Sequence, residues 1–596
     1  MVLPKHELEG KLGEETALIE SSALRDENPL EESDEFNQLI LTCRKGDLRR
    51  CQELISQGVN INAKDRFDCT PLIIASLCGH YELVQLLLES GALAERNTFQ
   101  GERCIYNALN DRIRNLLLQY DFSKTSDPYV YWSGHLASLL TRTVPWTSDI
   151  SLSSGSQAFH LHKFMLAART PYFRRKLEAQ PGTTSWSLAG AVPAESVRLV
   201  LGHIYLADLP RDLAPPGGSV SEEQVARGLD KISRQLGLDH LWEAIMAGHD
   251  RRLARQRFRD EEERALAQLG DFFRSSVLGR KVVVDADRVG DVGWKHDNPA
   301  FADVLLRADE ADEDEPEPEP DATTATGRPP RSAALYPVHK AVLIRSEYFA
   351  KMFSGDFVES QRAEHLRIVT VDFSPAVLEL VLTFLYTETI ACPLQHALDL
   401  LYAADMLLLD ALKAKAAQAI STLGSGTSDT PLAHGVPGKG GPAPPTEPIN
   451  IYDVIHAAWD LGVQRLEEFA ARYLANRLED YVDDPDFQDL IRESAERIHR
   501  REETDTIELL DDIRYHLSER FRLRFEDAGL DEMMRGGDRG DGDGAEAAAK
   551  SSAGTACAVP ALDGGEAQDE FASDALSYQM LLGKIDAMLE RLKLDA

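Results

Sequence analysis

Two stretches of the sequence place a histidine beside a lysine at the start of an apolar run. They are HLHKFMLAARTPYF, which contains His162 and Lys163, and VHKAVLIRSEYF, which contains His339 and Lys340. A neighbouring histidine and lysine could act as a base and a nucleophile, but a catalytic lysine needs a substrate pocket that lowers its pKa. The sequence indicates no such pocket, so we predict no catalytic role for either pair. Because the motif occurs twice, it also indicates a duplicated module.

The other residues that could do chemistry form no recognisable site. His160 and His162 would share one face of a strand, which is half of a zinc site, but no third ligand with metal spacing accompanies them. The seven cysteines contain no CxxC pair, and free cysteine packs as a small hydrophobe. The chain also lacks the GxxxxGKS/T, GxSxG and HExxH motifs. We therefore predict no catalytic, cofactor-binding or metal-binding residue and no cofactor.

Length and charge narrow the class of protein. At 596 residues, a chain with about 100–200 residues per domain should contain about three to five domains. The net charge of -35 argues against nucleic-acid binding, which needs a surplus of Lys and Arg. No apolar run approaches the length of about 18 residues that a membrane span requires. Reduced thiols and the absence of a signal peptide predict a cytoplasmic protein, with the nucleus as the alternative.

Residues 35–122 repeat with a period of 33, as in the pair Gly46 and Gly79, and this is the period of ankyrin repeats. In the segment TPLIIASLCGH, Thr70 can cap a helix whose first position is taken by Pro71. The residues of this ankyrin signature are Thr70, Pro71, Leu72, Ala75, Gly79 and His80. Two and a half repeats are visible, so we expect the following segment or the next domain to close the stack.

Two copies of one α+β unit follow, at residues 127–248 and 296–423. In the first copy, Ile150 and Leu152 alternate with polar residues, and Gln157–Leu161 can return as the second strand of a hairpin. Each copy continues through a helix that begins at the His-Lys pair and a second apolar helix. The last helix carries LGLDHL in the first copy and LLLDAL in the second.

The second copy carries an acidic insertion at residues 308–332. There, 35 residues separate Asp303 from His339, against 12 between Asp149 and His162. A segment with so much charge and proline cannot form a core, so we predict a disordered loop in water. Docking of a basic partner on this loop is the alternative.

The rest of the chain alternates between flexible and helical segments. Flexible segments are predicted at residues 1–34, 424–448 and 535–569. Helical segments are predicted at residues 249–295, 449–527 and 571–596. The basic run RRLARQRFRDEEERA at 251–265 could be a nuclear import signal, but its acid and base pairs at i, i+4 fit a linker helix in water better. The last helix has an apolar stripe long enough to dock on a neighbour or to pair chains.

The order of these modules resembles the ankyrin repeat and BTB/POZ domain-containing protein 1 family. The two α+β units are similar to BTB/POZ domains, and the closer match lies in CRKGDL, NTFQGERCIYNAL and RREETDTIELLDDIRYH. The resemblance covers most of residues 35–525 and the last helix. It implies a multidomain α and α+β fold, with a short ankyrin solenoid, two BTB/POZ domains, a helical BACK-like region and a terminal helix.

The resemblance also implies a role for the His-Lys stretches. In BTB folds an Asp at one end of the first strand lies close to the Lys of this motif, near the surface through which BTB domains pair. The corresponding charge pairs here are Asp149 with Lys163 and Asp303 with Lys340. Self-association would use that surface, or the two units of one chain could pair with each other.

A second family pattern lies just beyond the later His-Lys stretch. Many BTB proteins that bind cullin 3 carry an apolar residue, any residue and then Glu, shortly after a Met-Phe that ends this helix. Met352 and Phe353, followed by Phe357 and Glu359, fit the pattern. Phe357 would enter a cullin pocket while Glu359 would meet a polar rim. In the alternative, this is an ordinary loop and Phe357 covers the core of its own domain.

The first unit has RRKLEAQPGTTSW in the same place, without the pattern, so only the second unit is a cullin candidate. The stretch from His339 to Phe349 is one residue shorter than its counterpart in the first unit. We therefore expect the helix or the turn after it to be adjusted in the second unit.

Together these observations predict a non-catalytic adaptor that recruits a substrate to a cullin 3 RING ubiquitin ligase. The second BTB unit would hold cullin 3, helices between Pro448 and Phe521 would extend the contact, and the ankyrin stack would bind an unknown protein client. The alternative is a scaffold that joins partners through its ankyrin and BTB surfaces without ubiquitin transfer. We expect no nucleic-acid or membrane partner.

Overall fold

The computed structural model describes the greater part of the chain. The described residues are 28–94, 99–119, 129–310, 332–423, 450–501, 509–521 and 570–594, and a few isolated positions elsewhere. Within these ranges, residue 156 and positions within 189–191, 211–219, 247–250 and 356–362 are not described. Most of the segments predicted to be flexible lie outside these residues. The chain divides into two compact units, Met1–Asp429 and Thr430–Ala596, and each is described by itself.

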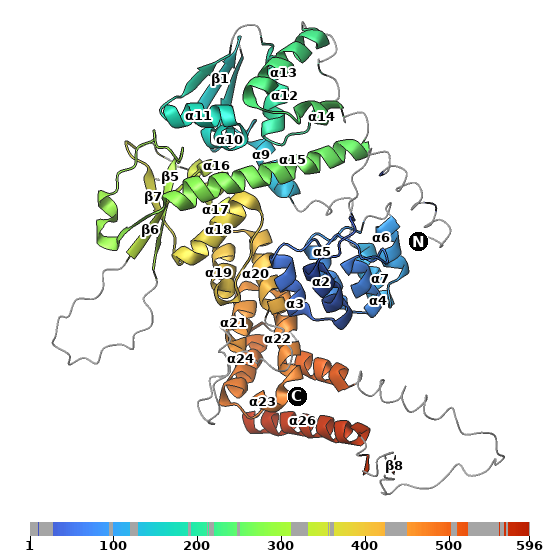
Figure 1. Cartoon of the computed structure of the whole chain (residues 1–596). Helices are drawn as coiled ribbons and strands as arrows, with labels where there is room; N and C mark the ends of the chain where they lie inside the picture. Colours follow the sequence, from blue (N-terminus) through green and yellow to red (C-terminus); the bar gives the residue numbers. More distant parts are fainter. Residues whose placement is uncertain are drawn as a thin grey trace, which may run out of the picture. The chain divides into compact units, whose positions relative to one another are not determined.

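Three helix pairs form the N-terminal stack (Figure 1). They are α2 (Asp34–Lys45) with α3 (Leu48–Ser56), α4 (Pro71–Cys78) with α5 (Tyr81–Glu89), and α6 (Phe99–Tyr106) with α7 (Asp111–Gln119). Buried side chains from all three pairs form one core that extends from Phe36 to Leu117. The third pair is complete, so our expectation of two and a half repeats was wrong. Its helices are joined by residues 107–110, where the second pair has only Gly79 and His80.

The first α+β unit is built on a three-stranded sheet with the order β2-β1-β3. The strands are β1 (Ile150–Ser154), β2 (Gln157–Leu161) and β3 (Ser185–Ser187). Ile150 lies opposite Leu161 in an antiparallel ladder, which confirms the predicted hairpin, and β3 pairs parallel to β1. The helices are α10 (Lys163–Arg169), α11 (Pro171–Ala179), α12 (Ala194–Ile204), α13 (Glu222–Leu236) and α14 (Leu241–Met246).

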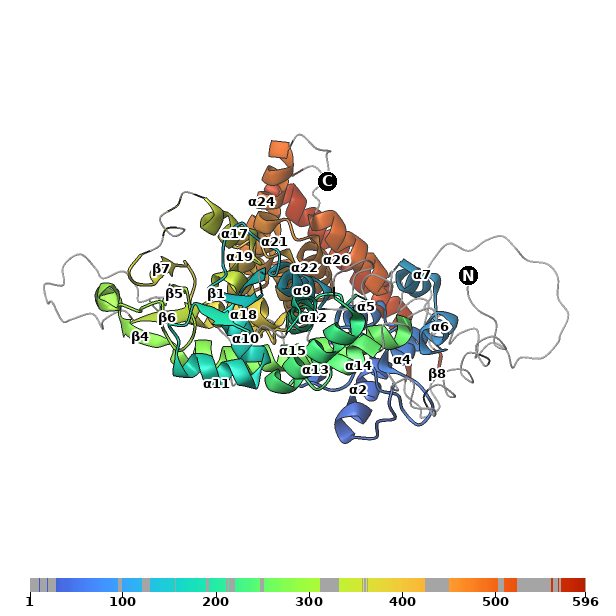
Figure 2. The same cartoon turned by 90° about the horizontal axis from the view of Figure 1, so that it is seen from above.

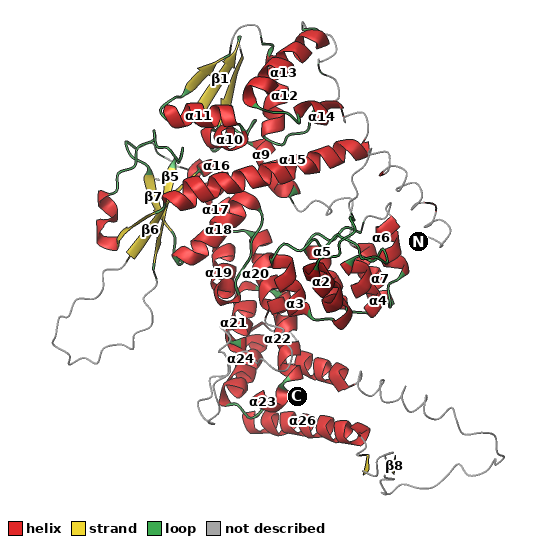
Figure 3. Cartoon of the chain, viewed as in Figure 1, coloured by secondary structure: helices red, strands yellow, loops and turns green. Residues whose placement is uncertain are grey.

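The second α+β unit repeats this arrangement and adds a strand, so that its sheet has the order β4-β6-β5-β7. The strands are β4 (Val282–Asp285), β5 (Val304–Asp309), β6 (Ser332–Val338) and β7 (Arg367–Thr370). The helices are α16 (Lys340–Leu343), α17 (Glu347–Ser354), α18 (Pro375–Thr387), α19 (Ala397–Met406) and α20 (Asp410–Leu423). In the hairpin, Val304 lies opposite Val338. Figure 3 shows the strands gathered in the two α+β units, apart from the short β8 and β9 near the C-terminus.

Two features of the second unit differ from the predicted boundaries. Residues 249–295 are not one linker helix: the helix is α15 (Arg251–Phe272), and β4 further along pairs with β6 as an edge strand of the second sheet. The hairpin strands β5 and β6 also take in residues 308–309 and 332 at the ends of the acidic insertion. Residues 311–331 of the insertion lie outside the described residues.

The helix that precedes each α+β unit packs against the other unit. Helix α9 (Val130–Ser138) leads into the first unit, but its Trp132 indole Nε1 donates to the Tyr386 carbonyl of α18 at 2.9 Å. Helix α15 leads into the second unit, but it also packs against α10 of the first, and Phe164 and Phe272 have ring centroids 6.4 Å apart. Figures 1 and 2 show α15 running beside α10. The two α+β units are thus paired within one chain by an exchange of helices.

The C-terminal unit is helical. Its labelled helices are α21 (Ile451–Leu461), α22 (Gln464–Asn476), α23 (Leu478–Tyr481), α24 (Pro485–Arg501) and α26 (Glu570–Leu592), beside a further helix at residues 509–521. It also holds the two-residue strands β8 (Val559–Pro560) and β9 (Glu566–Ala567). The apolar stripe of α26 is buried, with Ile585 fully covered. Arg514 pairs with Asp586 at 2.9 Å, so α26 docks inside its own unit. Among the described helices, none is both long and apolar enough to cross a membrane.

Candidate functional site

The histidine of each His-Lys stretch is fixed by hydrogen bonds on both sides of its ring. His339 Nε2 lies 2.9 Å from the Ala300 carbonyl, to which it must donate, so Nδ1 accepts from the Tyr386 hydroxyl at 2.6 Å. Burial lowers the pKa of His339 to about 4, so the ring is neutral near pH 7. A ring with both nitrogens engaged in the interior is structural.

His162 is held in the same way in the first unit. Its Nδ1 faces the Tyr205 hydroxyl at 3.2 Å, and its Nε2 lies 2.9 Å from the Thr147 hydroxyl. Burial lowers the pKa of His162 to about 3. His160, by contrast, is exposed on β2 and contacts the Trp146 ring edge at a centroid distance of 4.8 Å. The two histidines have different environments, and the described residues contain no cluster of metal ligands.

The two aspartates act through the main chain. Asp149 Oδ1 accepts the backbone N–H of Lys163 at 2.8 Å, and Asp303 Oδ1 accepts that of Lys340 at 2.7 Å. Each carboxyl group therefore fixes the start of the motif helix. The charge pair implied by the resemblance takes another form at Lys163, because its ammonium donates to the Pro181 carbonyl at 2.8 Å. The Lys340 ammonium lies 4.8 Å from the centre of the Phe353 ring.

Burial of these aspartates raises their pKa values. The pKa of Asp149 is raised to about 7, mainly by desolvation, and the neighbouring Asp303 of the other unit adds to the shift. The pKa of Asp303 is raised to about 6 by the same desolvation. The Phe164 and His339 rings have centroids 4.5 Å apart, so the motif segments of the two units meet where the units pair.

A buried ion pair joins α15 to the first unit. The Arg169 guanidinium binds Glu261 of α15, and the two side chains expose 1% and 7% of their surface. Arg169 also donates to the Ile204 carbonyl at 3.1 Å, and His203 Nε2 lies 3.3 Å from Glu261. Burial lowers the pKa of His203 to about 4, so its ring is neutral near pH 7 and Glu261 pairs with the arginine. Our interpretation of α15 as a linker helix in water was therefore wrong.

The stretch from the motif histidine to the phenylalanine is one residue shorter in the second unit, and the motif helix there is correspondingly shorter. Helix α16 ends at Leu343, whereas α10 runs to Arg169. The arginine itself keeps its role, because Arg345 Nη1 donates to the Phe384 and Leu385 carbonyls. Arg345 pairs with Glu388, which caps the C-terminal end of α18 in the same unit. The shortening changes the turn before α17 and leaves this anchor in place.

The predicted cullin-binding residues lie along α17 and just beyond it. Phe353 is buried at 7% exposure, and its ring stacks on Phe349 with centroids 6.0 Å apart. Met352 is half-buried, and Phe357 exposes 58% of its surface. The structure thus places Phe353 in the core and Phe357 at the surface. Glu359 lies outside the described residues.

Further apolar side chains are exposed beside this segment. The Ser346 hydroxyl that caps α17 donates to the Leu407 carbonyl at 2.6 Å, which brings the start of α17 to the end of α19. Exposed apolar residues flank that contact on both elements. We use the name second-unit apolar surface for the exposed Tyr348, Phe357, Tyr402, Met406 and Leu408 together with the half-buried Met352. Sequence reasoning missed the three from α19 and its turn, because an apolar helix does not show which of its faces is covered.

The first unit is polar at the matching positions of its last helices. Aligning LGLDHL of the first unit with LLLDAL of the second places Lys231, Gln235 and Gly237 where the second unit has Tyr402, Met406 and Leu408. Lys231 and Gln235 are exposed. The two units therefore present different chemistry on one equivalent surface, and only the second presents an apolar one there.

The ankyrin signature residues do what their types predict. Thr70 accepts the Ile73 N–H in its cap at 3.3 Å, and Gly79 ends the helix in the left-handed region at φ 86°. His80 Nε2 lies 3.0 Å from the Arg44 carbonyl and so joins neighbouring repeats. Leu72 and Ala75 are buried. Phe67, between the first two pairs, exposes 59% of its surface.

Comparison with known proteins agrees with this architecture. A BTB/POZ domain model matches residues 142–245 and 321–423, and an ankyrin repeat model with three copies matches residues 16–125. BTB/POZ domain-containing protein 3 of Schizosaccharomyces pombe is 35% identical over 509 residues, which cover 84% of this chain and 86% of that protein. The chain belongs to the ankyrin repeat and BTB/POZ domain-containing protein family.

Two further relatives are similar to this chain over lengths that differ widely. Ankyrin repeat-containing protein YIL001W of Saccharomyces cerevisiae is 32% identical over 523 residues, which cover 83% of this chain and 91% of that protein. Kelch-like protein 21 of Homo sapiens is 44% identical over 79 residues, which cover 13% of each chain. Ankyrin repeats and BTB/POZ domains are interaction modules, so this family member is a protein-interaction adaptor. The exchanged helices α9 and α15 pair its two BTB/POZ domains within the chain.

Proposed function

We propose that the chain recruits a protein client to a cullin 3 RING ubiquitin ligase and that its second BTB/POZ domain binds the cullin. The observation that carries this proposal is the second-unit apolar surface. It takes in Phe357, which the sequence pattern singles out, together with exposed residues of α19. A cluster of exposed aromatic and aliphatic side chains of this kind is typical of a protein-binding hot spot.

The first domain lacks the apolar side chains at the equivalent surface. Each domain has a sheet built on the same hairpin, a motif histidine and an anchoring arginine. The first domain nevertheless has Lys231 and Gln235 at the positions of Tyr402 and Met406. A charged and an amide side chain at the centre of an interface would lose water without a matched partner. We therefore assign one cullin site to each chain, on the second domain.

Intrachain pairing supports the same stoichiometry. The reciprocal contacts of α9 and α15 occupy the surface that joins the two domains. Pairing of two chains through that surface would require these buried contacts to open first. We propose that the chain binds cullin 3 as a single copy, with the ankyrin stack presenting its exposed loops, such as that at Phe67, to the client.

Binding of purified cullin 3 to the full chain tests this proposal. Tyr402→Ala combined with Phe357→Ala should weaken binding by about 30-fold or more, since one hot-spot truncation costs about 2 kcal/mol or more. The matched control is Lys231→Ala with Gln235→Ala at the equivalent positions of the first domain, and it should leave binding unchanged. If the wild-type chain does not bind cullin 3, the alternative holds, and the chain is a scaffold that joins partners without ubiquitin transfer.

A further inference from the structure

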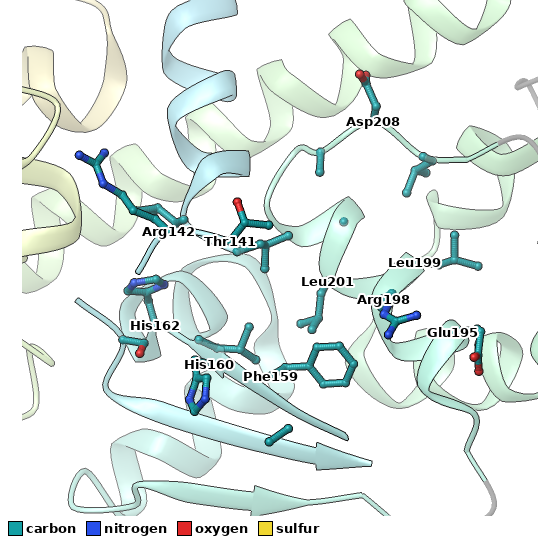
Figure 4. Close-up of a pocket in the computed structure, with 18 of the residues that line it drawn as sticks. Thr141, Arg142, Phe159, His160, His162, Glu195, Arg198, Leu199, Leu201 and Asp208 are labelled. Carbon is teal, nitrogen blue, oxygen red and sulfur yellow. The ribbon is translucent and has the colours of Figure 1, made fainter. Parts of the chain in front are cut away.

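The first BTB/POZ domain contains a pocket that the second domain fills with its own chain. The pocket has a volume of about 730 Å³ and lies between β2 and helix α12. Figure 4 shows Phe159, Leu199 and Leu201 around it, with Arg198 beside them. Trp146 at its rim exposes 54% of its surface. These walls combine apolar side chains with an edge of β2 that pairs with no other described strand.

The difference between the domains comes from the length of one connection. In the first domain, 11 residues at 139–149 join α9 to β1. In the second domain, 31 residues at 273–303 join α15 to β5, and they include β4. Strand β4 pairs antiparallel with β6, which is the counterpart of β2. Among the described strands, β2 has β1 as its only neighbour.

The connection of the second domain contacts positions whose counterparts line the pocket. Leu335 stands four residues before the motif histidine, as Ala158 does in the first domain, and it pairs with Val282 of β4. Glu379 stands seven residues before the tyrosine that binds that histidine, as Arg198 does in the first domain. Both Ala158 and Arg198 line the pocket.

In the second domain, β4 and the residue before it contact the equivalents of the pocket residues. Alternate residues Val282 and Val284 of β4 pack against the sheet, while Val283 between them is 59% exposed. The Lys281 ammonium pairs with Glu379 at 2.7 Å. In the first domain the charge at this position is reversed, because Arg198 stands where Glu379 stands. Arg198 is exposed, and it reaches Gln157 of β2 at 2.7 Å.

We propose that this pocket binds an extended segment of a partner protein, which adds to the edge of β2, carries aliphatic residues at alternate positions and places a carboxylate opposite Arg198. Strand addition satisfies the open backbone groups of an edge strand, and the side chains of alternate residues give specificity. The carboxylate follows from charge complementarity with Arg198. This site lies on the first domain and does not depend on cullin binding by the second.

The charge reversal gives a direct test with the full chain. The probe is a fluorescent peptide, FRSSVLGRKVVVD, which is the chain's own segment Phe273–Asp285, and a second peptide carries Lys281→Glu. Fluorescence anisotropy should show the Glu peptide binding about tenfold more tightly than the Lys peptide, with a blue shift of tryptophan emission from Trp146. The Arg198→Glu chain should reverse that preference.

Two controls make the result decisive. Arg227→Glu makes the same charge change on α13, where the side chain of Arg227 is 71% exposed, and should leave the preference unchanged. A Glu peptide with Asp in place of Val282 and Val284 should not bind. The proposal is overturned if neither peptide binds the full chain, if both bind equally, or if Arg198→Glu leaves the preference as it was.

Discussion

Neutralising Glu261 should separate α15 from the first BTB/POZ domain. Glu261→Gln keeps the shape of the side chain but leaves the Arg169 guanidinium, which is 1% exposed, without its counter-charge. Removing one partner of a buried ion pair costs about 3–5 kcal/mol. At about 1.4 kcal/mol for each factor of ten, α15 should open about 100- to 4000-fold more often.

Hydrogen exchange of the purified chain measures this opening directly, because exchange reports the local free energy of α15 and of the helix it covers, α10. The control is Glu263→Gln, two positions away on the exposed side of α15, where a lost charge costs about 0–1 kcal/mol. A second variant, Arg169→Met with Glu261→Met, should recover much of the protection, because an apolar pair can replace a buried ion pair. Equal exchange rates in Glu261→Gln and Glu263→Gln would refute our account of the paired domains.

Three further predictions concern other parts of the chain. Burial raises the pKa of Asp149 from 3.8 to about 7, so its contribution to stability is full below pH 3.8 and is lost as the pH rises towards 7. Between pH 5 and 7, the free energy of unfolding in urea should therefore fall more for the wild type than for Asp149→Asn. Parallel plots of this free energy against pH for the two proteins would contradict the prediction. Thr70→Ala should destabilise the ankyrin stack by about 1 kcal/mol in urea unfolding; no change would show that the cap is dispensable. Ile585→Ala should lower the stability of the C-terminal unit by about 2–5 kcal/mol, with the exposed Met580→Ala as control, and equal thermal midpoints would exclude docking of α26.

Local signals in the sequence were enough for most of the architecture. The hairpin of the first domain could be predicted because Ile150 and Leu152 alternate with polar residues and Gln157–Leu161 follows a short turn. The ankyrin helices could be predicted because Thr70 and Pro71 mark a helix start whatever lies around it. In both cases the signal and the structure lie within a few residues of each other.

Features that depend on distant contacts could not be predicted. The sequence of α15 is polar and predicts an exposed helix. Burial of its Glu261 could be predicted only from the position of Arg169, which lies 92 residues earlier in the chain. Strand β4 has only four residues and is recognisable by its pairing with β6. The sequence also could not show that Asp149 binds the backbone N–H of Lys163.

The candidate cullin site was only partly accessible from sequence. The pattern singled out Phe357, whose exposure agrees with a binding role. It did not reveal that Tyr402 and Met406 are exposed on α19, since both belong to a helix whose other apolar residues are buried or half-buried. Exposure of an apolar side chain is decided by what packs on its helix, which the local sequence does not specify.

Calorimetry of purified cullin 3 with the full chain measures whether the second-unit apolar surface binds the cullin. We predict a complex with one cullin per chain, which Tyr402→Ala with Phe357→Ala weakens by about 30-fold or more. Lys231→Ala with Gln235→Ala in the first domain should bind as wild type does. Equal affinity of the Tyr402 and Phe357 variant and wild type, or a stoichiometry of two cullins per chain, would contradict the account.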